Sequence, residues 1–339
     1  MDQIFIPKQD YKILVRCFTY NQSKYIEDAL NGFVMQKTNF PFVCVIMDDC
    51  STDGEQNVIK KWMERECDME HACSVDDNIA HIVVAPHNTN INCTFSFYYL
   101  KRNLYKEKNK KDIYLSPWRE RCEYEALCEG DDYWTDPLKL KRQVEFLDAN
   151  DSYSATAENG IVLNEINGTQ YLFSDEDDRD WTIREMIIKR RFPTAGVVFR
   201  KKCMEGLNEE CKYKFDSMLW CYLGKRGKFH YSKVVSNVYR RGPGITETTP
   251  KIEWAKQVEL WYLEFKRLYC PEYISLKEIN SCILRDYYNA IMDKSTSFLS
   301  NDMCCCLKKI YQYDGPSAVL GVIAKKTKLN IVSILKTNS

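Results

Sequence analysis

The stretch at residues 126–137, Ala-Leu-Cys-Glu-Gly-Asp-Asp-Tyr-Trp-Thr-Asp-Pro, constrains the fold more than any other part of the chain. It begins in an apolar run that is typical of a short buried strand, which Gly130 ends. Asp131 and Asp132 follow directly, and the next residues offer a helix cap and a proline for the start of a helix over 138–149. We therefore expect two adjacent carboxylates at the carboxyl edge of a sheet, where open α/β sheets bind ligands.

Two like charges this close together are costly unless a cation neutralises them. Magnesium-like ions bind one or two carboxylates together with phosphate oxygens, so Asp131 and Asp132 are typical of a site for a metal-bound nucleotide diphosphate. The alternative is that both aspartates only cap turns and face water. Taken alone, the two aspartates favour this second interpretation. The order of the remaining motifs along the chain favours the metal-bound nucleotide diphosphate instead.

Strands and helices alternate on both sides of this stretch. Before it we expect strands at 12–19, 42–47 and 81–85, each followed by a helix: one capped by Ser23 and running to 34, one ending near 66, and one over 94–105. Such alternation predicts a mostly parallel sheet with helices on both faces. The strand ends carry polar residues: Tyr20-Asn21, Asp48-Asp49 and His87-Asn88.

The segment 106–123 is strongly charged and is predicted to be a surface excursion. Beyond residue 150 the expected elements are strands at 153–157 and 160–165, a hairpin turn at 167–168, a helix over 182–190, a buried strand ending at 200, a helix opened by Asp216, a strand at 230–239 and a loop at 240–244 of phosphate-binding composition. From residue 250 the pattern is helical. We predict a domain over 1–247 and a helical appendage over 248–339.

Composition narrows the class of protein. Lys plus Arg and Asp plus Glu balance at 48 each, so no net charge recruits nucleic acid. The sixteen cysteines form no metal-binding spacing, many lie in apolar runs, and the amino terminus has no secretory pattern, so we expect a reduced, cytoplasmic protein. The stretch 317–335 mixes apolar residues with lysines, and it is interpreted as a terminal helix packed on the body, with contact to an anionic membrane surface as the alternative.

Four landmarks in order resemble the family 2 glycosyltransferases with the GT-A fold, over roughly residues 11–246. They are Val-Arg-Cys-Phe-Thr-Tyr-Asn at 15–21, Val-Ile-Met-Asp-Asp-Cys-Ser-Thr-Asp-Gly at 45–54, Cys-Glu-Gly-Asp-Asp-Tyr-Trp at 128–134, and Phe215-Asp216 followed by Val-Tyr-Arg-Arg-Gly-Pro-Gly at 238–244. The second and third are specific. The run through Trp-Thr-Asp-Pro-Leu-Lys-Leu at 134–140 is especially similar to enzymes that build bacterial surface polysaccharides.

The resemblance implies a role for each matching residue. Tyr20 and Asp49 match positions that contact the nucleotide base, and Asp131 matches the ribose-binding or metal-binding position. Asp132 looks like the direct ligand of a manganese or magnesium ion, and Asp216 matches the general base of inverting members. The predicted nucleotide-binding set is completed by the pair Arg240 and Arg241, where the family places a loop over the diphosphate.

The chain departs from the family pattern at three positions. Cys17 stands where a proline is common, Phe215 stands where the residue before the base is often Glu, and Gly242 stands where a histidine often follows the Tyr-Arg of the closing loop. Without that histidine, the cation must be held by Asp132, the diphosphate and water.

These features predict a metal-dependent, inverting glycosyltransferase that moves a sugar from a nucleotide-diphosphate sugar to a hydroxyl of a glycan or lipid-linked acceptor. Such transfer needs a stabilised leaving diphosphate, a positioned base and an in-line geometry. One alternative is a non-catalytic nucleotide-sugar-binding scaffold of the same fold. The other is a metal-dependent nucleotidyltransferase, although the chain lacks the glycine-rich, lysine-bearing phosphate loop that many such sites use.

Overall fold

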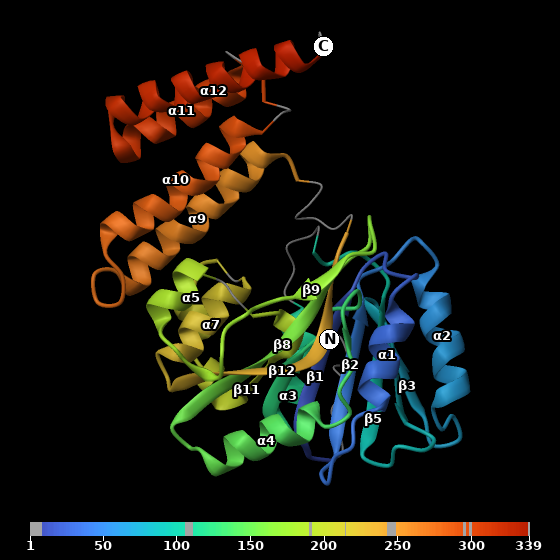
Figure 1. Cartoon of the computed structure of the whole chain (residues 1–339). Coiled ribbons are helices and arrows are strands. Elements are labelled where there is room, and N and C mark those ends of the chain that lie inside the picture. The colour runs from blue at the N-terminus through green and yellow to red at the C-terminus, as the bar shows by residue number, and fades with distance from the viewer. Residues whose placement is uncertain are drawn as a thin grey trace. The chain divides into compact units, whose positions relative to one another are not determined.

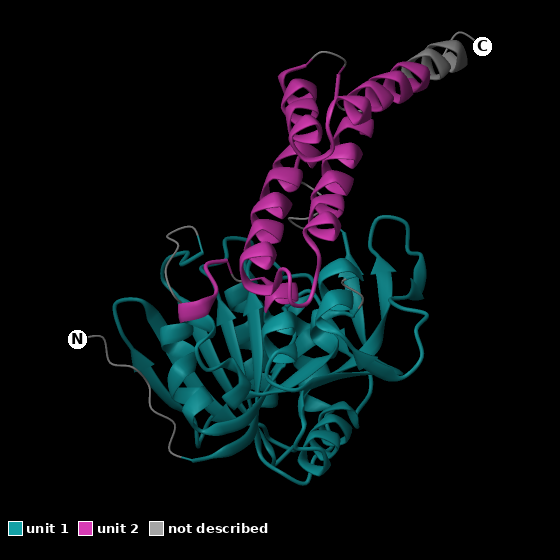
Figure 2. Ribbon diagram, turned by 90° about the vertical axis from the view of Figure 1, so that its left-hand side faces the viewer, with its two compact units in different colours: residues 1–208, 219–242 teal, residues 209–218, 243–339 magenta. Residues whose placement is uncertain are grey.

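The structure is a computed structural model that describes residues 9–105, 111–189, 192–213, 215–242, 249–293, 296–297 and 300–337. The chain divides into two compact units (Figure 2). Unit 1 comprises Met1–Asn208 and Leu219–Gly242, and unit 2 comprises Glu209–Met218 and Pro243–Ser339. The predicted domain boundary at residue 247 stays a prediction.

Unit 1 is built on one sheet of twelve strands among its described residues (Figure 1). Its main path runs β10-β12-β8-β11-β6-β1-β2-β5-β4-β3, with β7 paired to β12 and β9 paired to β8. The strands are β1 (Tyr11–Thr19), β2 (Phe42–Asp48), β3 (Cys73–Asp76), β4 (Ala80–Pro86), β5 (Cys93–Leu100), β6 (Cys122–Leu127), β7 (Tyr133–Trp134), β8 (Tyr153–Asn164), β9 (Gln170–Leu172), β10 (Arg179–Trp181), β11 (Val197–Arg200) and β12 (Lys228–Arg241).

Helices cover both faces of the sheet, as the alternating pattern predicts. The helices that lie wholly in unit 1 are α1 (Ile26–Val34), α2 (Glu55–Glu66), α3 (Asp112–Glu120), α4 (Lys139–Ala149) and α5 (Ile183–Lys189), whereas α6 (Leu207–Glu210) and α7 (Asp216–Gly224) include residues of both units. Apolar side chains of α1, α2 and α4 share one core with one face of the central strands. Those of α3 share a second core with the opposite face, so the central strands are buried on both sides.

The strand directions are mixed, which corrects the prediction of a mostly parallel sheet. The centre is parallel, because β1 pairs parallel with β2 and β6, and β2 pairs parallel with β5. The strands β8 and β12 are also parallel, whereas β3, β4, β7, β9, β10 and β11 pair antiparallel with their neighbours. An apolar run indicates burial but does not encode the direction of the strand.

The helix predicted over 94–105 is wrong, because Cys93–Leu100 is the strand β5. Its side chains alternate between the two cores, with Phe95 and Phe97 on one face and Tyr98 on the other. A strand buried on both faces has no polar face to reveal its period of two, so its apolar run also fits a helix. The antiparallel pairing of β4 with β5 also places His87 near Cys93, at the start of β5, through the bond from His87 N–H to Cys93 O of 2.9 Å.

The prediction of a surface excursion over 106–123 is wrong for its second half. Residues 106–110 lie outside the described residues, but 112–120 form α3. Tyr114, Leu115 and Trp118 on α3 are buried, and the Trp118 indole N–H donates to the Tyr98 hydroxyl at 2.8 Å. In the sequence, the charged residues before α3 obscure the amphipathic pattern of this helix, which belongs to the core.

Several smaller predictions are settled by the local backbone. The hairpin at Asn167-Gly168 is confirmed, because β8 pairs antiparallel with β9 and Gly168 has φ +71°. The two strands expected at 153–165 are the single strand β8, and α4 starts one residue later than expected. Ser23 does not cap α1, whose N-cap is Tyr25 without a side-chain bond.

The predicted loop at 240–244 is also corrected. Arg240 and Arg241 are the last two residues of β12, and they pair with Leu163 and Asn164 of β8. Residues 243–248 lie outside the described residues.

Unit 2 is helical over its described part (Figure 2). Its long helices are α9 (Lys251–Tyr269), α10 (Leu276–Met292), α11 (Asn301–Asp314) and α12 (Pro316–Thr337). The buried Glu259 of α9 accepts hydrogen bonds from the Tyr287 hydroxyl of α10 (2.5 Å) and the Tyr313 hydroxyl of α11 (2.6 Å), and it pairs with Lys309 (2.8 Å). One carboxylate thus joins three helices.

All sixteen cysteines are free thiols, and eleven of them are buried. Among the described residues, no helix has both the length and the apolar character that a membrane crossing requires.

Because α3 is part of the core, we expect Trp118→Ala to lower the free energy of unfolding by about 3–5 kcal/mol. Ile113 lies on the same helix and is 51% exposed, so Ile113→Ala should change the free energy of unfolding by only about 0.5 kcal/mol. Urea unfolding of both variants measures the difference. Equal small effects would contradict the buried position of α3.

Candidate functional site

The carboxyl ends of three strands meet at one edge of the sheet in unit 1. The Asp49 N–H, just after β2, donates to Thr19 O at the end of β1 (3.0 Å). The Gly130 N–H, after β6, donates to Phe18 O of β1 (3.0 Å). The turns that carry Tyr20, Asp49 and the Asp131–Asp132 pair are therefore neighbours along this edge.

The turns after β1 and β2 are locked to each other. Asn21 and Cys50 have φ of +55° and +62°, a backbone conformation that Asn tolerates better than most residues. The Asn21 N–H donates to Ser51 Oγ (2.9 Å), and the Thr52 N–H donates to Asn21 Oδ1 (2.8 Å). These bonds explain why polar residues follow both strands.

Glu55, at the start of α2, is a residue of this edge that the sequence reasoning missed. Its carboxylate is fully buried and accepts bonds from the Thr19 hydroxyl, the Gln22 N–H (2.8 Å) and the Ser51 hydroxyl (2.8 Å). Burial raises the pKa of Glu55 above its ordinary value. In the sequence, an acid in the first turn of a helix is explained by the helix dipole, so no signal distinguished it.

Gly130 is needed for the close approach of two turns. A Cβ added at Gly130 would meet Thr19 Oγ1, Gln22 Oε1 (2.6 Å) and Thr19 Cβ (2.7 Å), all closer than normal contact. The glycine thus lets the turn that bears the two aspartates lie directly against the turn after β1.

Asp49 is buried and binds groups of its own chain. Its Oδ1 accepts the Leu104 N–H (2.7 Å), its Oδ2 accepts the Tyr105 N–H (3.2 Å), and Lys111 Nζ lies 2.8 Å from Oδ2. A nucleotide base that donates to Asp49 would share the carboxylate with these donors or displace one of them. The neighbouring Asp48 has the contacts of a turn residue and accepts the Ser51 N–H at 3.0 Å.

The two aspartates of the acidic pair differ in burial, because Asp132 is buried and Asp131 is half-buried. Asp132 is buried, and its Oδ1 accepts the backbone N–H of Arg240 (2.9 Å). Burial raises the pKa of Asp132 well above its usual range, and the negative charge of Asp131 raises it further. An ionised Asp132 therefore needs positive charge, which a bound divalent cation would supply.

A divalent cation fits the donors of this turn. Among the residues that the structure describes, no group of three or more His, Cys, Asp or Glu side chains could hold a metal ion by itself. Ions of the magnesium type are, however, commonly held by one or two carboxylates together with substrate phosphates and water. The turn after β6 offers two carboxylates, Asp131 and Asp132, for such a site, and their role as metal ligands stays a prediction.

Arg240 and Arg241 differ in their surroundings. The Arg240 side chain is 8% exposed and pairs with Glu165 and Asp28, whereas Arg241 is exposed and its Nη1 lies 3.4 Å from the Tyr171 hydroxyl. The sequence motif does not distinguish these two adjacent arginines, but burial does.

Tyr20 is half-buried at the end of β1, and Asp216 is exposed at the first residue of α7. Asp216 belongs to unit 2, whereas Asp49, Asp131 and Asp132 belong to unit 1. The convergence of Asp216 with the other acidic residues therefore stays a prediction.

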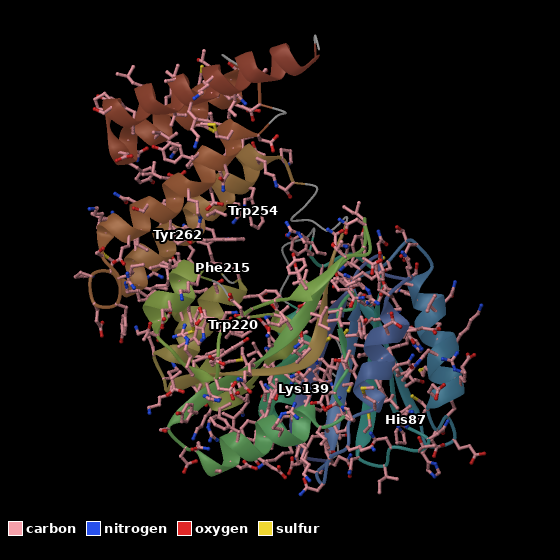
Figure 3. All side chains as sticks on the ribbon, viewed as in Figure 1. His87, Lys139, Phe215, Trp220, Trp254 and Tyr262 are labelled. Carbon is pink, nitrogen blue, oxygen red and sulfur yellow. The ribbon has the colours of Figure 1, made fainter. Side chains whose placement is uncertain are left out.

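Other residues considered from the sequence have structural contacts (Figure 3). Trp134 is buried against Phe33 and donates to Ala195 O at 2.8 Å. Trp220 is buried and packs against Phe192 and Phe229, which stack on each other. His87 is buried and its Nδ1 accepts the Asn90 N–H at 2.9 Å. Because His87 lies at the amino-terminal end of β5, it is at the opposite edge of the sheet from the aspartates.

Lys139, in the first turn of α4, is a second residue that the sequence reasoning missed (Figure 3). It is fully buried, it donates to Gln143 Oε1 at 2.5 Å, and its Nζ lies 4.8 Å from the Trp134 ring centroid. Burial lowers the pKa of Lys139 to about 8.

The fold and this edge define the class of protein as an α/β protein with the GT-A fold. Residues 1–349 of TarS from S. aureus superpose with a TM-score of 0.56 at 17% identity, over 92% of this chain and 83% of that chain. The same TarS fragment in complex with UDP superposes with a TM-score of 0.51 at 17% identity, over the same shares. At this identity the likeness concerns the fold.

The sequence comparisons agree with the resemblance. Residues 17–91 match the family described as glycosyl transferase family 2, so the resemblance is confirmed for this part of the chain. The uncharacterized protein Rv1520 of Mycobacterium tuberculosis is 31% identical over 185 residues, 54% of this chain and 45% of that protein. The putative teichuronic acid biosynthesis glycosyltransferase TuaG of Bacillus subtilis is 26% identical over 163 residues, 46% of this chain and 52% of that protein. The chain thus spans about half the length of these relatives.

Because a Cβ at Gly130 would overlap Thr19 and Gln22, we expect Gly130→Ala to lower the free energy of unfolding by about 1–3 kcal/mol. Gly321 on α12 has open space at its Cβ, so Gly321→Ala should cause no loss. Urea unfolding measures both. An unchanged stability of Gly130→Ala would show that the two turns do not require their close approach.

The buried Glu55 predicts a pH dependence of stability. A carboxyl whose pKa is raised by folding stabilises the fold most below its unfolded pKa, and this contribution is lost as the pH rises through the folded pKa. Glu55→Gln removes the titration, so the stability of the wild type relative to this variant should fall as the pH rises from about 4.3 towards neutrality.

Urea unfolding near the two ends of this pH range measures the difference. Glu64→Gln, on the exposed part of the same helix, is the matched control and should show no such trend. A relative stability of the wild type that increases with pH would contradict the raised pKa.

Proposed function

We propose that the chain is a metal-dependent, inverting glycosyltransferase that uses a nucleotide-diphosphate sugar as donor. The observation that carries the proposal is the edge of the sheet where the turn after β6 presents Asp131 and Asp132 beside the turns after β1 and β2. The family 2 domain and the GT-A fold support it. A fold alone does not imply a reaction, so the proposal depends on these side chains.

The residues of this edge divide the tasks of sugar transfer. Asp132, together with Asp131, holds the divalent cation of the bound diphosphate, and manganese or magnesium suits two carboxylates and phosphate oxygens. When bound, this cation stabilises negative charge on the leaving diphosphate as a Lewis acid. Tyr20 stacks on the base, and Asp49 accepts an N–H from it.

Contact with the phosphates is assigned to Arg241. The side chain of Arg241 is exposed at the end of β12, whereas that of Arg240 is only 8% exposed. A guanidinium recognises phosphate oxygens through parallel hydrogen bonds. Arg240 therefore acts through the acidic turn instead of binding the donor itself.

Asp216 is the proposed general base. A carboxylate within hydrogen-bond reach of the acceptor hydroxyl takes its proton as the oxygen attacks the anomeric carbon, and the diphosphate leaves from the opposite face. Its place at the exposed start of α7 leaves the carboxylate accessible to an acceptor.

The acceptor is proposed to be a growing glycan or a lipid-linked sugar, met at the cytoplasmic face of a membrane. The name of the relative TuaG, which refers to teichuronic acid biosynthesis, supports a surface-polysaccharide acceptor. Lys325 and Lys328 are exposed on α12, and the chain has no acidic residue after Asp314, so this part of unit 2 suits an anionic surface.

Nucleotide binding is tested by thermal unfolding with UDP, GDP, CDP or ADP, each with and without Mn²⁺. We expect one of the four to stabilise the protein only when Mn²⁺ is present, by about 2.7 kcal/mol at a concentration of one hundred times its Kd. Asp132→Asn should abolish this stabilisation, because it removes the charged ligand. Asp148→Asn, which changes a carboxylate at the end of α4, should preserve it. Absence of any metal-dependent shift would refute the proposal.

Catalysis is tested with Asp216→Asn. We expect kcat to fall by about 10²–10⁴-fold, while binding of the Mn²⁺–nucleotide complex is unchanged. Release of the nucleoside diphosphate from its sugar nucleotide, with acceptor present, measures the rate. A variant that retains full turnover would remove Asp216 from the mechanism and leave the binding proposal intact.

A further inference from the structure

One arginine, Arg240, forms hydrogen bonds to both residues of the acidic pair, Asp131 and Asp132. The backbone N–H of Arg240 donates to Asp132 Oδ1 (2.9 Å), and Arg240 Nη1 donates to the backbone O of Asp131 (2.8 Å). The turn that carries the two carboxylates is thus held by the main chain and the side chain of a single residue of β12.

The guanidinium of Arg240 is itself held on several sides. Its Nε donates to Glu165 Oε1 (3.0 Å), and its Nη2 pairs with the carboxylate of Asp28 on α1. Its Cζ lies 4.8 Å from the ring centroid of Tyr25 and 4.5 Å from that of Tyr133. The planar guanidinium of Arg can pair with two carboxylates and also stack on two aromatic rings. The compact ammonium of Lys does not match this set of partners.

The strand pairing places Arg240 opposite the acidic turn. β7 pairs antiparallel with β12, with Tyr133 opposite Val238 and Trp134 opposite Asn237. Gly32 of α1 allows this arrangement, because a Cβ there would lie 2.9 Å from the backbone N of Trp134. The acidic turn is therefore fixed between α1 on one side and β12 on the other.

We propose that Arg240 is the positioning residue of the cation site, which fixes the Asp131–Asp132 turn in the orientation that binds the divalent cation of a nucleotide diphosphate. Asp28 and Glu165 orient the guanidinium. This inference rests on the proposed function of Asp132. A metal ligand must be held within a fraction of an ångström, and residues that orient ligands typically control metal affinity.

The test compares Arg240→Gln with a matched arginine elsewhere in unit 1. Arg179 pairs with Glu176 (3.0 Å) and Glu185 (2.9 Å) and lies 4.6 Å from the Trp181 ring centroid, so it makes the same kinds of contact away from the acidic turn. Arg179→Gln therefore removes a guanidinium with similar ion pairs and a similar ring contact, without changing the cation site.

The measurement is the affinity for Mn²⁺ in the presence of the nucleoside diphosphate that binds the wild type, by titration calorimetry or by the electron paramagnetic resonance signal of free Mn²⁺. We expect Arg240→Gln to weaken Mn²⁺ binding by about 10–100-fold and Arg179→Gln to leave it unchanged. Arg240→Lys, which keeps the charge but not the fork, should recover only part of the affinity.

Glu165→Gln provides a second route if Arg240→Gln fails to fold. It keeps Arg240 and removes one orienting charge, so it should weaken Mn²⁺ binding by a smaller factor in the same direction. The inference is overturned if Arg240→Gln and Glu165→Gln bind Mn²⁺ as the wild type does. A wild type that binds no Mn²⁺–nucleotide complex overturns the proposed function and this inference with it.

Discussion

The contact on which the rest of the structure depends is the close approach of two turns around Gly130. β1 lies between β2 and β6 in the sheet, so the turns that follow these strands must share one edge. The bond from Gly130 N–H to Phe18 O and the missing Cβ bring the acidic turn against the end of β1. Beneath the same edge, the buried Glu55 carboxylate joins the turns after β1 and β2 through three hydrogen bonds. A site for a highly charged ligand requires a rigid edge, because side chains that are displaced from the ligand contribute much less to binding it.

Three of the buried carboxylates at this edge, those of Glu55, Asp49 and Asp132, are stabilised in different ways. Glu55 accepts hydrogen bonds from neighbouring turns, and Asp49 accepts two backbone N–H groups and pairs with Lys111. Asp132 accepts one N–H from Arg240 and lies beside the second carboxylate of Asp131. Burial of an acid is therefore not sufficient to indicate a cation site. The combination of burial, a charged neighbour and incomplete compensation is what favours a bound divalent ion at Asp132.

Local signals in the sequence predicted some elements correctly and misled on others. The acidic turn after β6 and the hairpin at Asn167-Gly168 have strong turn residues, and the structure has both, although the two-residue strand β7 lies between the acidic turn and α4. The sequence pattern of β5 predicts a helix, because a strand buried on both faces lacks alternation of apolar and polar residues. The helix α3 was hidden by the charged residues before it, although Trp118 anchors it in the core. Glu55 and Lys139 had no distinguishing pattern, since their burial depends on distant segments.

The sequence by itself determined the alternation of elements, the acidic turn and the likeness to family 2 glycosyltransferases, because turn residues and apolar runs are local and are read directly along the chain. Only the tertiary structure decided the direction of the outer strands, the edge on which His87 lies, and the different burial of Arg240 and Arg241. Each of these depends on which segments meet in space. Burial, pairing and charge compensation are properties of contacts between residues far apart in the chain, and such contacts have no local signature.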